Sequence, residues 1–120
     1  MLYHLALDRE WRAALASGEY RMSTRGARFE DVGFVHAAFA DQVQGVADRY
    51  YADVTEPVVL LVIDEGRLTV PWRVDAAPDG HGYPHLYGPL NPEAVAQVLP
   101  VRRDARGGLA VRLPDDPGVT

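Results

Sequence analysis

The chain has 120 residues, of which 48% are hydrophobic and 24% charged, and this composition fits a single globular domain. It contains no cysteine, which excludes disulfides, thiolate nucleophiles and zinc–thiolate sites within this sequence. The net charge of −5 argues against general nucleic-acid binding, which needs many cationic contacts to phosphates. We find no signal-peptide pattern and no apolar run that could span a bilayer, so we expect a soluble cytoplasmic protein with no membrane partner.

The first third of the chain predicts a strand, a helix and an exposed connection. Residues 2–7 alternate as in a β-strand, with His4 on one face. Asp8 is suited to cap the helix that follows, and Gly18 is suited to end it. Residues 20–31 are polar and predict an exposed connection. The helix is expected to bury an apolar stripe made of Trp11, Ala14 and Leu15.

The middle of the chain predicts three strands and one helix. Residues 34–37 read as a short strand that carries His36. Apolar side chains recur at helical spacing over residues 40–51, which predicts a helix. The run at residues 57–63 is rich in β-branched side chains and is typical of a strand buried on both faces. Residues 68–74 alternate again and predict another strand.

The last third begins with a loop at residues 76–82, which is built from proline, aspartate and glycine. Asn91 and Pro92 form the start signal of a helix, which predicts a short helix carrying Ala94, Val95 and Val98. Residues 101–103 and 109–111 flank two glycines and predict a hairpin.

These elements mix strands and helices without regular alternation, which favours an α+β fold. We therefore predict a single domain over residues 1–113, with a mostly antiparallel sheet and flanking helices. Residues 114–120 are expected to form a flexible tail.

The candidate functional side chains are three histidines in ordered segments, namely His4, His36 and His85. An imidazole can donate, accept and titrate near neutral pH, so it suits catalysis. For each one the alternative is a structural histidine that makes two hydrogen bonds. Three histidines can also hold zinc, but no two of these three are closely spaced in the sequence, and we expect no metal.

Other common catalytic patterns are missing from the sequence. Neither Gly-x-Gly-x-x-Gly nor Gly-x-x-x-x-Gly-Lys occurs, which argues against dinucleotide-binding and phosphate-binding loops of these types. Serine occurs only at Ser17 and Ser23, and neither lies in a nucleophile-elbow pattern. A serine triad is therefore not expected.

Five segments taken together resemble a known family. The most specific of them is the block that runs from Tyr83 to Leu90 and contains His85-Leu86-Tyr87-Gly88. The others are Leu2-Tyr3-His4-Leu5-Ala6, Gly33-Phe34-Val35-His36, Val46-Ala47-Asp48-Arg49-Tyr50-Tyr51 and Val58-Val59-Leu60-Leu61-Val62-Ile63. Over residues 2–100 the chain resembles the bacterial domain-of-unknown-function family DUF952.

That family is similar in fold to ADP-ribosyltransferases and to NAD-dependent RNA 2′-phosphotransferases. The resemblance implies an ADP-ribosyltransferase-like fold and a cleft that binds NAD or another small nucleotide-type ligand. It implies catalytic roles for His4, His36 and His85, and cofactor contacts by His4, Arg49 and Tyr87.

The sequence also departs from the family pattern. Ala37-Ala38 stands where members often carry a polar pair such as Cys-Ser, and Arg73 stands where they often carry a glutamate. Glu65 and Glu93 remain candidates for the glutamate of a transferase. Three functions stay open: an ADP-ribosyl or glycosyl transferase, a non-catalytic ligand-binding or protein-interaction module, and a histidine metal-site enzyme.

Overall fold

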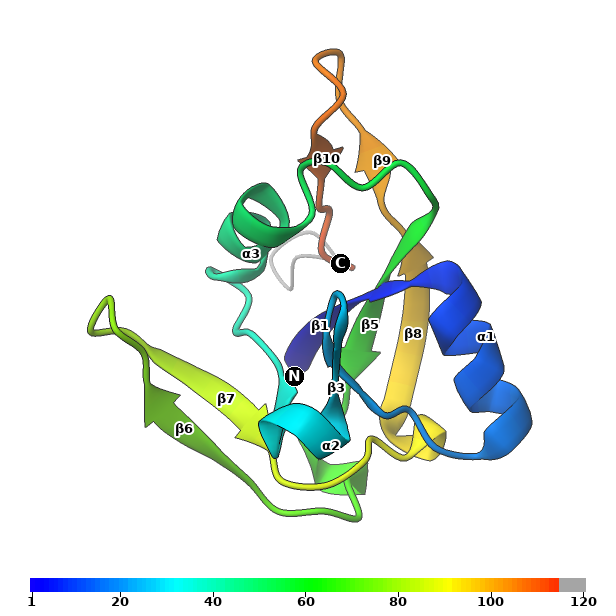
Figure 1. Cartoon of the computed structure of the whole chain (residues 1–120), viewed down its shortest axis with the longest axis vertical. Helices are drawn as coiled ribbons and strands as arrows, with labels where there is room; N and C mark the ends of the chain where they lie inside the picture. The colour runs from blue at the N-terminus through cyan, green and yellow to red at the C-terminus, as the bar shows by residue number, and fades with distance from the viewer. Residues whose placement is uncertain (115–120) are drawn as a thin grey trace.

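The computed structural model describes residues 1–114 (Figure 1). Of the predicted tail, only Pro114 falls within these residues, and the rest lies outside them. The described part is α+β with antiparallel sheets, which confirms the predicted fold class at that level. No helix within residues 1–114 is long and apolar enough to cross a membrane.

A three-stranded antiparallel sheet forms the centre of the molecule (Figure 1). Its order is β1 (Leu2–Leu7), β5 (Val58–Ile63) and β8 (Val95–Pro100), with β5 in the middle. Every residue of β5 is buried, as its run of β-branched and leucine side chains predicts. The predicted strands at residues 2–7 and 57–63 are therefore confirmed.

The central sheet separates two hydrophobic cores, because successive side chains of a strand point to opposite faces. Leu61 of β5 packs in the first core, together with Trp11 from helix α1 (Asp8–Ser17). Leu60 packs in the second core, together with Ala47 from helix α3 (Val43–Tyr50). The small hairpin of β9 (Arg102–Arg103) and β10 (Leu109–Ala110) adds Leu109 to the second core and confirms the predicted hairpin.

A second three-stranded antiparallel sheet carries the candidate functional side chains. Its order is β4 (Val35–His36), β7 (Gly82–Leu86) and β6 (Trp72–Ala76). The β6–β7 hairpin extends to one side of the molecule, below α3 in the view of Figure 1. His36 pairs with His85, and His85 pairs with Arg73, so these three side chains share one face. Val35 and Leu86 lie on the opposite face, in the first core.

Two isolated bridges connect these parts. Tyr3 of β1 exchanges backbone hydrogen bonds with Ala38, just after β4, at 2.9 and 2.7 Å. Tyr20 does the same with Leu90, just after β7, at 2.9 and 3.0 Å. The first bridge places β4 beside β1 and so brings His36 close to His4.

Helix α1 ends as predicted but begins differently. Gly18 ends it in a left-handed conformation (φ 90°) that favours glycine. Asp8 does not cap the helix, because it lies inside the first turn, where its carboxylate pairs with Arg12 at 2.8 Å. The predicted apolar stripe is too wide by one residue, since Leu15 is 58% exposed.

The predicted connection at residues 20–31 is mostly exposed or half-buried, but the expectation that it lacks strands and helices is wrong. This segment forms β2 (Met22–Thr24), β3 (Ala27–Arg28) and the short helix α2 (Phe29–Val32). Tyr20 and Ser23 are buried within the fold. The sequence did not predict this burial, because tyrosine is amphipathic and serine is small, so either residue can be exposed or buried. Packing against other strands decides which.

The prediction of a helix after Asn91 is also wrong. The start signal produces only a 3-10 turn, Pro92–Ala94, and β8 follows it at once. Strand β8 pairs with β5 along its length, so ladder hydrogen bonds override the local helix signal.

The predicted strand at residues 68–74 starts later, at Trp72, after a 3-10 turn at Glu65–Arg67. The predicted loop at residues 76–82 is shorter in the structure, because β6 ends at Ala76 and β7 begins at Gly82, and it forms the turn between these two strands.

Candidate functional site

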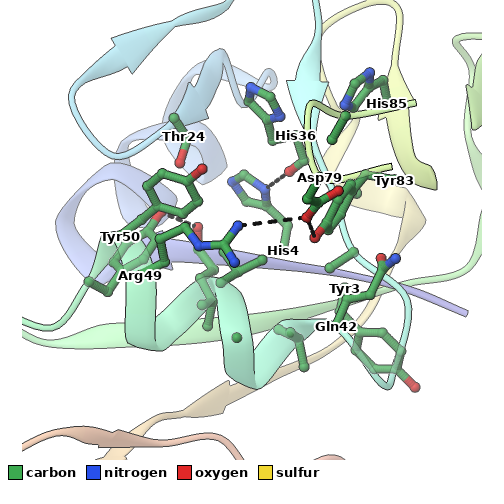
Figure 2. A pocket seen from close by; sticks show the side chains of 18 of the residues that line it. Tyr3, His4, Thr24, His36, Gln42, Arg49, Tyr50, Asp79, Tyr83 and His85 are labelled. Atoms are coloured by element: carbon green, nitrogen blue, oxygen red, sulfur yellow. Dashed lines mark hydrogen bonds and ion pairs between the residues drawn. The ribbon is translucent and has the colours of Figure 1, made fainter. Parts of the chain in front are cut away.

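A pocket of about 540 Å³ lies between β1, β4, α3 and the turn of the β6–β7 hairpin (Figure 2). This volume is in the usual range for small-molecule sites. Four of the side chains predicted from the sequence line it together, and they are His4, His36, Arg49 and His85. Aromatic rings from separate segments of the chain also line the wall, and they include Tyr3, Phe34, Tyr50 and Tyr83.

His4 is buried, and the protein itself occupies both of its ring nitrogens. Nδ1 donates a hydrogen bond to the backbone carbonyl of His36, as Figure 2 shows. A carbonyl can only accept, so Nδ1 carries the proton and Nε2 accepts from the Tyr20 hydroxyl at 2.9 Å. Burial lowers the pKa of His4 to about 4, so the ring is neutral at neutral pH. His4 thus ties β1 to Tyr20 and to the strand that carries His36.

His36 and His85 form a pair at the pocket wall. Their ring centroids lie 5.1 Å apart with an interplanar angle of 89°, because the two residues are directly paired across β4 and β7. Phe34 stacks on His85, with ring centroids 4.0 Å apart at 15°, and makes a T-shaped contact with His36, with centroids 4.7 Å apart. Burial, assisted by the neighbouring His85, lowers the pKa of His36.

Asp75 lies behind His85, outside the pocket lining. Nδ1 of His85 donates to Oδ2 of Asp75 at 2.8 Å, and the Tyr87 hydroxyl donates to the same oxygen. Arg73 donates from Nε to Oδ1 at 3.0 Å, and its guanidinium lies 4.5 Å from the centre of the Tyr87 ring. The Tyr87 hydroxyl is the main cause that lowers the pKa of Asp75, so the carboxylate stays ionised.

Asp75 is a candidate functional residue that was not predicted from the sequence. Alternation along β6 could have indicated it, because Asp75 is two residues from Arg73 and therefore on the same strand face. Its closeness to His85 depends on the register of β6 against β7, which the sequence pattern does not define. Tyr87 contacts Asp75 and is not part of the pocket lining.

Arg49 faces the turn of the hairpin across the pocket (Figure 2). Its Nη1 lies 3.9 Å from Oδ2 of Asp79, and the Tyr83 hydroxyl donates to the same oxygen at 3.0 Å. The backbone N–H of His81 is the main cause that lowers the pKa of Asp79. Gln42, at the start of α3, donates from Nε2 to the carbonyl of Gly82 at 2.7 Å. These contacts hold the hairpin against α3, while the long Arg49–Asp79 pair leaves the guanidinium accessible.

The remaining candidates lie elsewhere. Glu65 pairs with the N-terminal amine at 3.0 Å, and neither Glu65 nor Glu93 lines the pocket. Within residues 1–114, no group of three or more histidine, aspartate or glutamate side chains is arranged to hold a metal ion.

Comparison with known proteins agrees with the family resemblance. A family model described as "Protein of unknown function (DUF952)" matches residues 5–98. This chain belongs to the DUF952 family. The match covers the pocket residues His36, Arg49 and His85 and also Asp75. None of the curated proteins matches the chain.

Solved structures of a protein from Caulobacter crescentus, CC0527, share the fold of this DUF952 member. The crystal structure of CC0527 is 28% identical, with a TM-score of 0.79, and the alignment covers 91% of this chain and 92% of that one. A double-methionine variant gives a TM-score of 0.79 at 27% identity, with the same coverage. The solution structure gives a TM-score of 0.70 at 28% identity and covers 89% of each chain.

Proposed function

We propose that the pocket binds a small nucleotide-type molecule of the NAD or ADP-ribose class. The observation that carries this proposal is that Arg49, the His36–His85 pair and two accessible tyrosine rings converge on one pocket from separate segments. A guanidinium suits phosphate oxygens because its planar fork offers paired donors. Aromatic rings suit a flat base, and imidazoles suit ribose hydroxyls.

Each side chain has a role in this proposal. Arg49 contacts phosphate from α3, and Tyr50 or Tyr83 stacks on a ring of the ligand. His36 and His85 contact sugar hydroxyls at the other end of the pocket. His4 acts through its hydrogen bond to the His36 carbonyl and keeps β4 in place. The resemblance to ADP-ribosyltransferases supports the same class of ligand.

We expect Arg49→Gln to weaken ADP-ribose binding by about tenfold or more, because it removes a charge-assisted hydrogen bond to phosphate. Isothermal titration of ADP-ribose and NAD into each protein measures this. Arg67→Gln is a matched control, since Arg67 is also an accessible arginine in a long ion pair, 3.5 Å from Asp64, but lies outside the pocket. Absence of binding to the unchanged protein, or equal affinity in Arg49→Gln, would refute the proposal.

We expect Asp79→Asn to act in the opposite direction and tighten ADP-ribose binding by about three- to tenfold. The substitution removes a carboxylate that competes with the ligand's phosphates for Arg49 and repels them. The same titration measures the change. If the Arg49–Asp79 pair were only a structural link, both substitutions would weaken binding, and this outcome would contradict the assignment of Arg49 to phosphate.

A further inference from the structure

We infer that the pocket also carries out proton transfer, with Nε2 of His85 as the general base and Asp75 as the residue that positions it. The reaction class is hydrolysis at an electrophilic carbon. The inference rests on the proposed function only in that both use the same pocket, and it does not depend on the class of ligand. It assigns a role to a carboxylate that does not itself reach the pocket.

Within the part of the chain that the structure describes, only one ring nitrogen of His85 makes a hydrogen bond. Nδ1 is held by Asp75, which lies outside the pocket lining, while His85 itself lines the pocket. Nε2 has no hydrogen-bond partner among residues 1–114. Among residues 1–114, Ser23 Oγ is the only fully buried side-chain nitrogen or oxygen atom without a hydrogen-bond partner. Because Nε2 of His85 also lacks a partner but is not such a buried atom, it keeps access to solvent. An ionised carboxylate accepts the Nδ1 proton, and the Nε2 lone pair then remains available.

The imidazole is held more firmly than an ordinary surface histidine. Phe34 stacks on its plane, and Asp75 is itself fixed by Tyr87 and Arg73. The chain supplies its own comparison, because His81 also pairs with an aspartate, Asp79. That pair is longer, at 3.4 Å between Nδ1 and Oδ1, and the His81 side chain is 74% exposed. The His85 side chain is only 11% exposed, and its Nδ1 lies 2.8 Å from the carboxylate.

The proposed step balances as a hydrolysis. Nε2 takes a proton from a water molecule whose oxygen forms a bond to the electrophilic carbon of the substrate. The bond between that carbon and the leaving group breaks, and the leaving group keeps the electron pair. The imidazolium then returns its proton to the leaving group or to solvent. Asp75 holds the Nδ1–H tautomer and stabilises the imidazolium by its charge.

The first test is hydrolysis of p-nitrophenyl acetate by the full chain, followed by release of p-nitrophenolate. We expect a rate above that of buffer, which falls to background in His85→Gln. We expect Asp75→Asn to lower kcat by about 10- to 100-fold with KM nearly unchanged, because the substrate does not touch Asp75. His81→Gln is the matched control and keeps the full rate. A rate that is unchanged in His85→Gln overturns the inference.

The second test reads the tautomer of His85 directly by nitrogen-15 NMR of the imidazole ring. We expect the proton on Nδ1 in the unchanged protein. In Asp75→Asn the amide NH₂ can donate to Nδ1, and the proton then moves to Nε2 and blocks the base. A purely structural Asp75 would leave the tautomer unchanged. An unchanged tautomer together with an unchanged kcat therefore overturns the role of Asp75.

Adding ADP-ribose to the hydrolysis assay separates this inference from the proposed function. Inhibition by ADP-ribose supports both, because the two compounds then share the pocket. Hydrolysis that depends on His85 but is insensitive to ADP-ribose supports the inference and refutes the proposed ligand class. Binding of ADP-ribose without any hydrolysis that depends on His85 refutes the inference and leaves the proposed function standing.

Discussion

Leu61→Ala is expected to lower the free energy of unfolding by about 2–5 kcal/mol. Leu61 is fully buried in the middle of β5, where it lies between His4 of β1 and Val98 of β8. Its side chain packs in the same core as Val35 and Leu86, which are the neighbours of the two pocket histidines on β4 and β7. Truncation removes apolar contacts and leaves a cavity that a close-packed interior cannot fully close.

Urea denaturation measures the free energy of unfolding of Leu61→Ala, and Val98→Ala is its control. Val98 is the direct neighbour of Leu61 on the edge strand, but it is 39% exposed. We expect Val98→Ala to cost less than about 1 kcal/mol, because little buried area is lost there. Equal costs for the two substitutions would contradict the assignment of β5 as the central buried strand.

On acidification from about pH 7 to about pH 4.5, His4→Gln is expected to lose about 2–3 kcal/mol less free energy of unfolding than the unchanged protein. The folded chain lowers the pKa of His4 from 6.5 to about 4, chiefly because burial disfavours the charged ring. The unfolded chain leaves His4 near its ordinary value, so protons bind the unfolded state more tightly. The neutral His4 contributes its full stability above about pH 6.5, and that stability is lost as the pH falls towards and through about 4. Glutamine does not titrate and avoids this loss.

The measurement is the free energy of unfolding of both proteins at about pH 7 and about pH 4.5. At the higher pH we expect His4→Gln to be less stable by about 1–2 kcal/mol, because an amide only partly replaces the bonds to Tyr20 and to the His36 carbonyl. The carboxyl groups titrate in both proteins, and their effects cancel in the difference. Equal losses on acidification would show that His4 is not buried in the neutral form.

The sequence pattern predicted the elements whose burial repeats at a fixed period. Strands β1 and β5 and helix α3 fall close to the predicted ranges, because alternation and helical spacing reflect which faces are buried. Local signals failed where a distant strand competed with them. The helix signal at Asn91 gave way to pairing with β5, and Tyr20, at the start of the polar segment, forms a bridge with the distant Leu90.

The sequence by itself determined a single α+β domain of the DUF952 family and pointed to His4, His36, Arg49 and His85 as candidates. Only the tertiary structure decided how these side chains differ. His4 has both ring nitrogens occupied, whereas His85 has one nitrogen held by Asp75 and one without a partner among residues 1–114. The reason is that a histidine's chemistry depends on which atoms face each of its nitrogens. Those atoms come from strands far apart in the chain, and strand register sets their positions.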